Sequence, residues 1–226
     1  MTDVLEVKED LKKDNEKEAE KVRAFLNEKG VFMVNLMGSP GCGKTTTLLR
    51  TIETLKDEYK IGVLEADVDG TIDTETVRET GVGVMQLHTS GLCHMSANMT
   101  MDALQAFLKE DYDLIFLENI GNLVCPAEFD VGQDIRAMIL STPEGDDKPL
   151  KYPLMFTVSD VLLINKCDVA EVFDFDYDRC RDNVRRLNEN MDIIRISSLK
   201  NEGLDEWINY LRKKIEEKKH ENDRTA

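Results

Sequence analysis

Residues 38–45 have the types and spacing needed to hold a chain of phosphates. They read Gly-Ser-Pro-Gly-Cys-Gly-Lys-Thr and match the pattern G-x-x-x-x-G-K-[ST]. Glycines let the backbone curl so that N–H groups point at phosphate oxygens, and a following helix presents its positive N-terminal end. The lysine can reach the β- and γ-phosphates, and the threonine hydroxyl can bind Mg²⁺. We therefore expect a nucleoside triphosphate site formed by Gly38, Ser39, Gly41, Cys42, Gly43, Lys44, Thr45 and Thr46.

Two acidic residues follow short apolar runs further along the chain. Asp67 follows Ile61–Leu64, and Glu118 follows Leu114–Leu117. Open parallel sheets bind ligands at the carboxyl ends of their strands, so both carboxylates are placed to serve Mg²⁺ or the attacking water. With Lys44 they are the predicted catalytic groups. For Glu118 a plain surface carboxylate is the alternative, and Asp69 and Asp73 are weaker candidates.

Gly121 comes three residues after Glu118. A glycine there allows a γ-phosphate to contact the backbone N–H, which would make residues 119–125 a nucleotide-sensing segment.

The tetrapeptide Asn165-Lys166-Cys167-Asp168 follows the apolar run 161–164. A carboxylate in that position can accept from N1–H and the N2 amine of guanine together, which adenine cannot offer. Lys166 can lie along the base, and Asn165 can bridge neighbouring loops. Ser197 and Ser198, after the next apolar run, add to the pattern. The sequence thus predicts GTP rather than ATP, with a solvated loop as the alternative.

Cys93, His94 and Cys125 form a possible metal set. Two thiolates and an imidazole suit zinc or nickel and leave a position for water, substrate or a second subunit. Adjacent residues cannot face the same way on a regular helix, so Cys93 and His94 must lie in a loop or at a helix start, which Gly91 permits. Buried cysteines without a ligand role are the alternative. We expect no metal role for Cys42, Cys167, Cys180, His88 and His220.

Short apolar runs alternate with helical stretches from residue 31 onward, which indicates parallel strands with crossover helices. Continuous apolar strands suit a sheet covered on both faces, so the expected fold is α/β, mostly parallel and doubly wound. We expect a helical, amphipathic extension at 1–30, one nucleotide-binding domain at 31–220 and a frayed tail at 221–226. The expected strands lie within Val31–Met37, Ile61–Leu64, Val82–Leu87, Leu114–Leu117, Ala137–Leu140, Val161–Ile164 and Ile193–Ile196, and helices within Leu48–Leu55 and Leu204–Lys219.

Composition excludes several classes of partner. The chain has 226 residues and a formal charge of −16, which opposes binding to nucleic acid or anionic lipid. No apolar run is long enough to span a bilayer, and the first residues lack the apolar core of a signal peptide. Five cysteines do not form the even framework of a small secreted fold. We expect a cytoplasmic protein.

Together these residues resemble the HypB family of hydrogenase nickel-incorporation GTPases, relatives of the urease accessory GTPases of the UreG type. The resemblance extends from about Val31 to the C-terminal helix. Urease-type relatives carry Cys-Pro-His, whereas no proline separates Cys93 from His94 here. The stretches that carry the resemblance to HypB are GSPGCGKTT (38–46), Cys93-His94, ENIGNLVCP (118–126), STPEGDDKPLKYP (141–153) and NKCD (165–168).

The resemblance implies a GTPase with a P-loop fold that dimerises in the GTP state and holds a metal at the subunit interface. The sequence shows no obvious arginine finger, so we expect slow hydrolysis. Cys93, His94 and Cys125 match the family's ligands for Ni²⁺ or Zn²⁺, and Thr45, Asp67 and Glu118 match groups that serve Mg²⁺ and hydrolysis. The implied partners are a second copy, a nickel chaperone of the hydrogenase maturation system and a hydrogenase large-subunit precursor. Hydrolysis of GTP to GDP would release the dimer and the nickel.

The chain departs from the family where TGKxCHLDA is usual. From residue 89 it reads Thr-Ser-Gly-Leu-Cys-His-Met-Ser-Ala. Gly91 therefore stands in place of the lysine and Ser96 in place of the aspartate, and Ser90 stands in place of the preceding glycine. The N-terminus also lacks the cysteine-rich and histidine-rich nickel motifs of some members. The alternatives are a HypB-like GTPase that serves carbon monoxide dehydrogenase or urease, and a regulatory GTPase without metal delivery.

Overall fold

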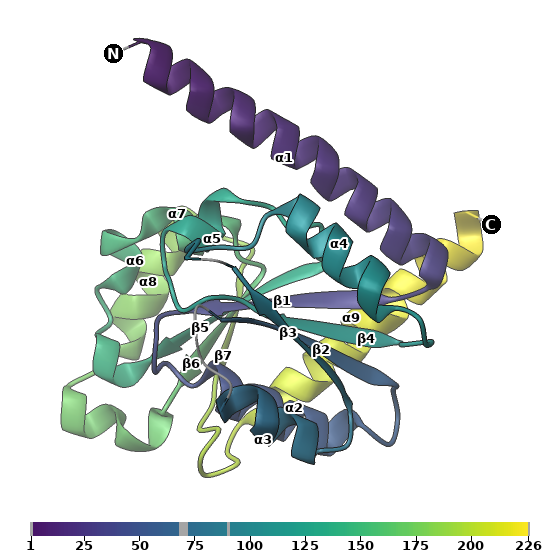
Figure 1. Cartoon of the computed structure of the whole chain (residues 1–226). Coiled ribbons are helices and arrows are strands. Elements are labelled where there is room, and N and C mark those ends of the chain that lie inside the picture. The colour runs from purple at the N-terminus through teal and green to yellow at the C-terminus, as the bar shows by residue number, and fades with distance from the viewer. Residues whose placement is uncertain (1, 68–71, 90, 226) are drawn as a thin grey trace.

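The protein is a single α/β unit built on one parallel sheet (Figure 1). The computed structural model describes residues 2–67, 72–89 and 91–225, without the side chains of 2–10, 67, 72, 73, 223 and 225. Asp69 and Ser90 therefore lie outside the described residues, as do the side chains of Asp67 and Asp73. Seven strands pair in the order β3-β2-β4-β1-β5-β6-β7, and every pair is parallel. The strands are β1 (Phe32–Gly38), β2 (Ile61–Asp67), β3 (Gly83–His88), β4 (Leu114–Glu118), β5 (Ile135–Ser141), β6 (Val161–Asn165) and β7 (Asp192–Arg195).

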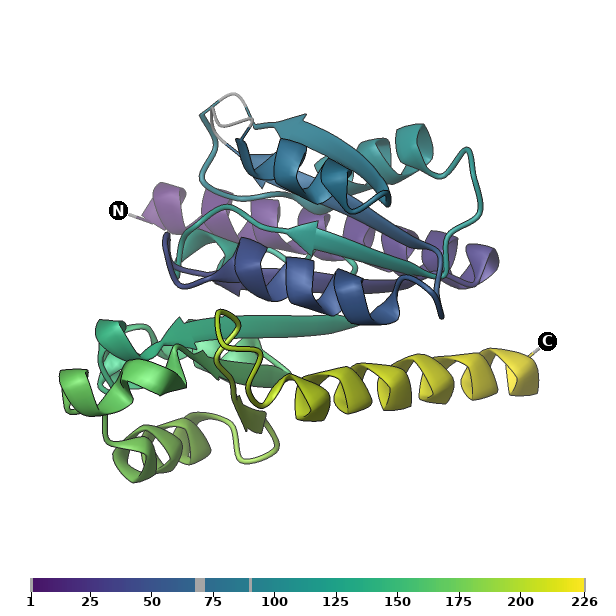
Figure 2. The same cartoon turned by 90° about the horizontal axis from the view of Figure 1, so that it is seen from below.

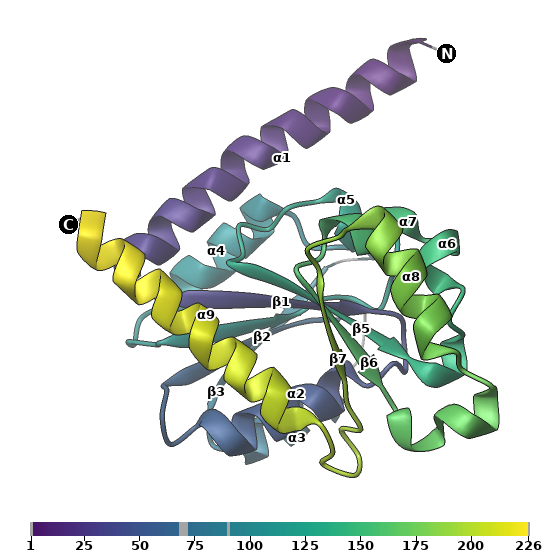
Figure 3. The ribbon, with the colours of Figure 1, turned by 180° about the vertical axis from the view of Figure 1, so that it is seen from behind.

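Helices cover both faces of this sheet, as expected for a doubly wound fold (Figures 1 and 3). One face carries α2 (Lys44–Leu55), α3 (Ile72–Glu79) and α9 (Leu204–Thr225). The other carries α1 (Thr2–Lys29), α4 (Ala97–Phe107), α5 (Cys125–Glu128), α7 (Pro153–Val158) and α8 (Tyr177–Leu187). The remaining short helices are α6 (Lys148–Lys151) and the 3₁₀ turns η1 (Thr142–Glu144) and η2 (Cys167–Phe173).

Strand β1 explains why the apolar runs are continuous. Phe32, Val34 and Leu36 pack toward α2 and α9, whereas Met33 and Met37 pack toward the opposite helices. Successive strand residues face opposite sides of a sheet, so a strand covered on both sides must be apolar throughout. All seven residues of β1 are buried.

The strand order also determines where a ligand can bind. β1 lies between β4 and β5, and the chain winds in opposite directions on its two sides, which opens a crevice at the carboxyl ends of the strands. The 38–45 loop leaves β1 at this point. Register places Leu36 opposite Glu118, and Glu118 opposite Glu65 on β2. The two carboxylates thus lie side by side on neighbouring strands near their carboxyl ends, beside the loop.

Both ends of the chain form long helices, the first within the region predicted to be helical and the second longer than predicted. Residues 2–29 form one continuous helix of 28 residues, which crosses α4 and projects past the sheet at its N-terminal end (Figures 1 and 2). α9 continues to Thr225, through residues expected to fray, and lies beside α2 (Figure 2). There Trp207, fully buried, donates from Nε1 to Thr51 Oγ1 at 3.0 Å. None of the described helices is long and apolar enough to cross a bilayer.

Candidate functional site

A cavity of about 590 Å³ opens at the carboxyl ends of β1, β2 and β4. Lys44, 9% exposed, donates from Nζ to the carbonyls of Gly38 and Ser39 at 3.4 and 3.3 Å, so its ammonium lies against the loop. The walls come from the phosphate loop, β2, the segment after β4 and one lysine of the NKCD tetrapeptide. They are Pro40, Gly41, Gly43, Lys44, Thr45, Thr46, Glu65, Ala66, Glu118, Asn119, Ile120, Gly121 and Lys166.

The loop needs glycine at two crowded positions. A Cβ on Gly38 would lie 2.6 Å from the Ile139 carbonyl oxygen, and one on Gly43 would lie 2.3 Å from Asn165 Nδ2. Gly43 also has φ +100°, a conformation that other residues rarely adopt. It is the N-cap of α2, so the helix starts directly at Lys44 and its free N–H groups face the cavity.

The acidic side of the cavity carries the groups expected to serve Mg²⁺. Thr45 Oγ1 donates to Glu118 Oε1 at 2.8 Å, and Glu118 is 6% exposed. A hydroxyl and a carboxylate that meet beside a phosphate loop are the hard oxygen donors that Mg²⁺ prefers, so these residues fit the ion. Glu65, which was not predicted, is buried, accepts a hydrogen bond from Thr74 Oγ1 and also lines the cavity. The signal was available, because Glu65 is two residues from Asp67 on one strand.

The NKCD tetrapeptide ties the base side of the site to the phosphate loop. Asn165 Nδ2 donates to Cys42 O at 2.9 Å, and its Oδ1 accepts from the N–H and hydroxyl of Ser198 at 3.1 and 3.0 Å. Lys166 Nζ donates to Gly41 O at 2.7 Å. Asp168 is exposed, and its Oδ1 accepts from Ser197 Oγ at 2.6 Å. Asn165, Ser197 and Ser198 are thus buried supports, while Lys166 and Asp168 are open to a base.

Cys93, His94 and Cys125 converge on the side of the sheet covered by α4 and α5. Their ligand atoms lie within 4.8 Å of one another, the one such group found among the described residues. Cys93 Sγ is 2.7 Å from Cys125 Sγ and 3.7 Å from His94 Nδ1. Around a tetrahedral ion at 2.0–2.3 Å, ligand atoms are about 3.3–3.8 Å apart, so small shifts would suffice. The pair 93–94 lies in the loop before α4, not on a regular helix, as its chemistry requires.

The surroundings of these groups set their protonation. Burial lowers the pKa of His94, against the effect of Glu128, so the imidazole stays neutral and able to bind metal. The hydrogen bond from Cys93, together with burial, raises the pKa of Cys125. The His94 ring stacks on Phe129, with centroids 3.9 Å apart and planes 15° apart, which orients the imidazole. Phe129 was not foreseen, since its role depends on a contact across 35 residues of chain.

One segment joins the two sites. Asn122 pairs with Gly38 of the phosphate loop, where its N–H donates to Gly38 O at 3.1 Å. Its Oδ1 accepts from the N–H of Val124 at 2.8 Å, next to Cys125. Gly121 lies so close to Pro40 that a Cβ would be 2.9 Å from Pro40 Cγ. Residues 119–125 therefore connect the phosphate loop to a cysteine of the metal set.

Comparisons with known proteins identify the chain's relatives. Residues 32–195 match the nucleotide-binding domain of the CobW/HypB/UreG family. The hydrogenase maturation factor HypB of Escherichia coli K12 is 40% identical over 92% of this chain and 72% of the relative. The probable HypB of Methanocaldococcus jannaschii is 36% identical over 96% of this chain and 98% of the relative. The chain belongs to the HypB family.

Solved HypB structures have the same fold. HypB of Archaeoglobus fulgidus superimposes with a TM-score of 0.84 at 38% identity, over 89% of this chain and 98% of that one. HypB of Helicobacter pylori, solved in complex with nickel, gives a TM-score of 0.85 at 35% identity, over 90% of this chain and 96% of that one. The predicted parallel, doubly wound P-loop fold is confirmed.

The departures from the usual HypB sequence have local explanations. Ser96, in place of the aspartate, is the N-cap of α4, and its Oγ accepts from Met99 N at 3.4 Å. Either residue can cap a helix, so the change preserves this function. Gly91, in place of the lysine, is exposed with φ +87° and open space around it, so it contributes a turn and no charge.

The 141–153 stretch acquires a role that its sequence did not reveal. Glu144 of η1 hydrogen-bonds Ser39 of the phosphate loop, and its second oxygen accepts from the N–H and hydroxyl of Ser141, each at 2.8 Å.

Cys42, behind the loop, is fully buried, and burial raises the pKa of its thiol to about 11. Cys42 is thus an inert part of the loop's packing.

Proposed function

We propose that this protein is a GTP-hydrolysing switch that delivers nickel during the maturation of nickel-iron hydrogenase. The supporting observation is that a phosphate loop and a Cys-His-Cys set share one segment, residues 119–125. Relatives named hydrogenase maturation factors, and one solved with nickel, support the assignment of cargo. Nickel is the substrate of this cycle rather than a resident cofactor.

The nucleotide part of the proposal follows the loop's chemistry. The N–H groups at the start of α2 and the ammonium of Lys44 would hold the β- and γ-phosphates, and Asp168 would read guanine. Thr45, Glu118 and Asp67 would hold Mg²⁺, which neutralises charge on the phosphate oxygens when bound. Glu118 would also orient the attacking water. No arginine is among the described residues that line the cavity, so turnover should be slow, roughly 10⁻⁴ to 10⁻² per second.

The metal part of the proposal involves a second copy of the chain. Cys93, His94 and Cys125 leave a metal position open, and exposed Leu92 and Val124 flank the two cysteines. A dimer that forms in the GTP state would cover these apolar side chains and complete the site. Hydrolysis would release the dimer and its nickel to a hydrogenase large-subunit precursor in the cytoplasm, with a nickel chaperone as supplier. A relative named hydrogenase/urease maturation factor supports urease as a second recipient.

Calorimetry with Ni²⁺ and Zn²⁺ tests this function. The chain should be titrated with GDP or with a slowly hydrolysed GTP analogue, beside a Cys93→Ala/Cys125→Ala variant and a Cys167→Ala control. We expect binding that depends on the 93/125 pair, persists in the control and differs between the nucleotides, with dimers in the GTP-analogue sample. Nucleotide-driven dimers without cysteine-dependent metal binding would instead support a regulatory GTPase.

A further inference from the structure

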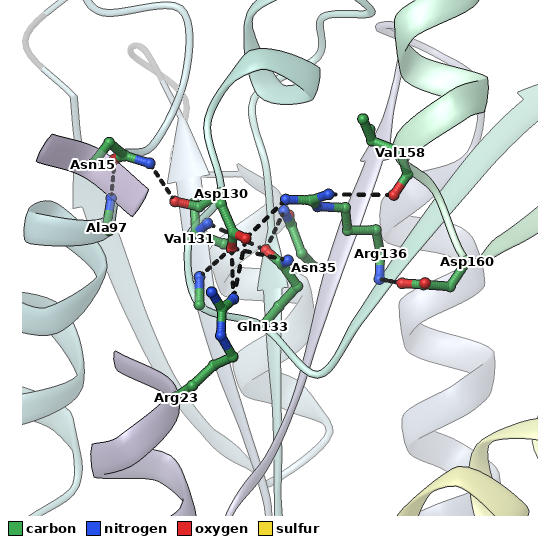
Figure 4. Close-up of polar contacts among 11 residues, drawn as sticks. Asn15, Arg23, Asn35, Ala97, Asp130, Val131, Gln133, Arg136, Val158 and Asp160 are labelled. Carbon is green, nitrogen blue, oxygen red and sulfur yellow. Dashed lines mark hydrogen bonds and ion pairs between the residues drawn. The ribbon is translucent and has the colours of Figure 1, made fainter. Parts of the chain in front are cut away.

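Helix α1 contacts both segments that carry the Cys-His-Cys set, and one side chain joins them. Asn15 Oδ1 accepts from the N–H of Ala97 at 2.9 Å, and Asn15 Nδ2 donates to the carbonyl of Asp130 at 2.7 Å (Figure 4). Ala97 is the first residue of α4, three residues after His94. Asp130 directly follows Phe129, whose ring stacks on His94. The side chain therefore spans the gap between the loop that carries Cys93 and His94 and the segment that carries Cys125.

We propose that Asn15 is a positioning residue that holds these two ligand-bearing segments at the separation required for metal binding. The inference rests on the metal site of the proposed function and adds a requirement for α1. It assigns α1 a role in the metal site, although none of the helix's described side chains belongs to the Cys-His-Cys set.

The position of α1 is fixed by further contacts with the Cys125 segment. Arg23 Nη1 donates to both carboxylate oxygens of Asp130 at 3.1 Å (Figure 4). Lys12 pairs with Glu128 at 3.6 Å. The helix also packs tightly on Gly132, where a Cβ would lie 2.4 Å from Val22 Cβ. These contacts make α1 a rigid reference from which Asn15 reaches the start of α4.

The chemistry of the bridge requires an amide. Asparagine donates and accepts from one planar group, which neither a carboxylate nor a hydrocarbon can do. The N–H of Ala97 lies at the helix start, where it has no partner within the helix, so Asn15 satisfies a group that Ser96 does not. Metal sites have ligand distances within about 0.2 Å of their usual values. Rotation of the Cys93 and Cys125 side chains can reach those distances only while their backbones stay in place, so a slide of α4 relative to Asp130 would impair binding.

The test compares metal affinity in full-length, GDP-loaded variants. Co²⁺ is the probe, because its thiolate charge-transfer absorption reports how the cysteines bind, and Zn²⁺ is titrated in competition. We expect Asn15→Ala to bind Co²⁺ about tenfold more weakly, with a changed spectrum, as for other residues that orient metal ligands. Asn27→Ala, the same change at an exposed position of the same helix, should leave the Co²⁺ affinity and the spectrum unchanged.

Two further variants separate the arms of the bridge. Asn15→Asp keeps an acceptor for Ala97 but loses the donor to Asp130, and Asn15→Gln keeps both groups on a longer stem. We expect each of these two variants to lose part of its Co²⁺ affinity. A positioning role predicts that GDP affinity stays at the wild-type value in all of them, because the phosphate loop is not contacted by Asn15.

The outcomes separate failure of this inference from failure of the proposed function. Wild-type protein without cysteine-dependent Co²⁺ binding would overturn the metal site itself. Wild-type affinity and spectrum in Asn15→Ala, with binding lost in Cys125→Ala, would overturn only the role of Asn15. If Asn15→Ala does not fold, wild-type affinity in both Asn15→Asp and Asn15→Gln would have the same meaning.

Discussion

At the scale of single residues, base selectivity depends on the placement of one carboxylate. Asp168 is exposed, yet Ser197 Oγ holds one of its oxygens at 2.6 Å. Lys166, in the left-handed region with φ +59°, turns the chain so that the next residues face outward, and Thr142 Oγ1 donates to its carbonyl at 2.8 Å. The carboxylate is thus oriented before a base arrives, which lowers the cost of ordering it on binding.

We predict that Asp168→Asn weakens GTP binding about a hundredfold. The change replaces an acceptor of two charge-assisted hydrogen bonds by a group that also presents N–H, a loss of about 3 kcal/mol. Ser197→Ala removes only the orienting bond and should weaken GTP by less than about tenfold. Displacement of a fluorescent GDP analogue by GTP and ATP measures both. Unchanged GTP affinity in Asp168→Asn would show that the NKCD loop does not read the base.

At the scale of elements, the phosphate loop and the NKCD loop form one unit through Asn165. We predict that Gly43→Ala weakens GDP binding more than about tenfold, because its Cβ would collide with Asn165 Nδ2 and the backbone would be strained at φ +100°. Gly41→Ala is the matched control: φ is +72°, but the space around a Cβ is open. It should cost only the strain, about 1 kcal/mol of unfolding free energy. Calorimetry measures the GDP affinity of both variants, and urea unfolding measures their stability. If the two variants lose the same affinity and the same stability, the collision with Asn165 has no effect.

The strands and the phosphate loop could be predicted because their signals are local. A run such as 114–117 is apolar throughout since both faces are covered, and 38–45 is defined by spacing alone. Contacts between distant segments gave no such signal. Asn15, Glu144 and Phe129 lie in stretches with ordinary polarity, and their partners are 82, 105 and 35 residues away, respectively. One helix end also differs from the expectation: the tail from residue 221 was expected to fray, whereas α9 continues to Thr225.

At the scale of the whole molecule, Asp130 is the point where the terminal helix, the sheet and the metal-bearing segment meet (Figure 4). Its carboxylate accepts from Arg23, from Gly132 N–H at 2.8 Å and from Gln133 Nε2 at 3.2 Å, and it pairs with Arg136 at 3.1 Å. A buried chain of amides then leads inward. Asn35 donates to Gln133 Oε1 at 3.4 Å and accepts from Asn119 at 3.1 Å, and Asn119 lines the nucleotide cavity.

The protonation of Asp130 should therefore affect stability. Burial alone would raise the pKa of this carboxyl, but the Gly132 N–H and the charges of Arg136 and Arg23 outweigh it and lower the pKa. A carboxyl with a lowered pKa in the folded state stabilises the fold above its unfolded pKa of about 3.9 and loses that effect as pH falls through the folded value.

We predict that Asp130→Asn lowers the free energy of unfolding by about 2 kcal/mol at pH 7, because two arginines lose their carboxylate partner. The deficit should stay constant down to about pH 5 and shrink below about pH 4, where the wild-type carboxyl becomes protonated as well. Urea unfolding across this pH range measures it. Asp14→Asn, on the exposed side of α1 beside Lys17, is the control and should change stability by less than about 0.5 kcal/mol. A deficit in Asp130→Asn that persists undiminished at acid pH would mean that Asp130 acts through its shape and hydrogen bonds rather than through its charge.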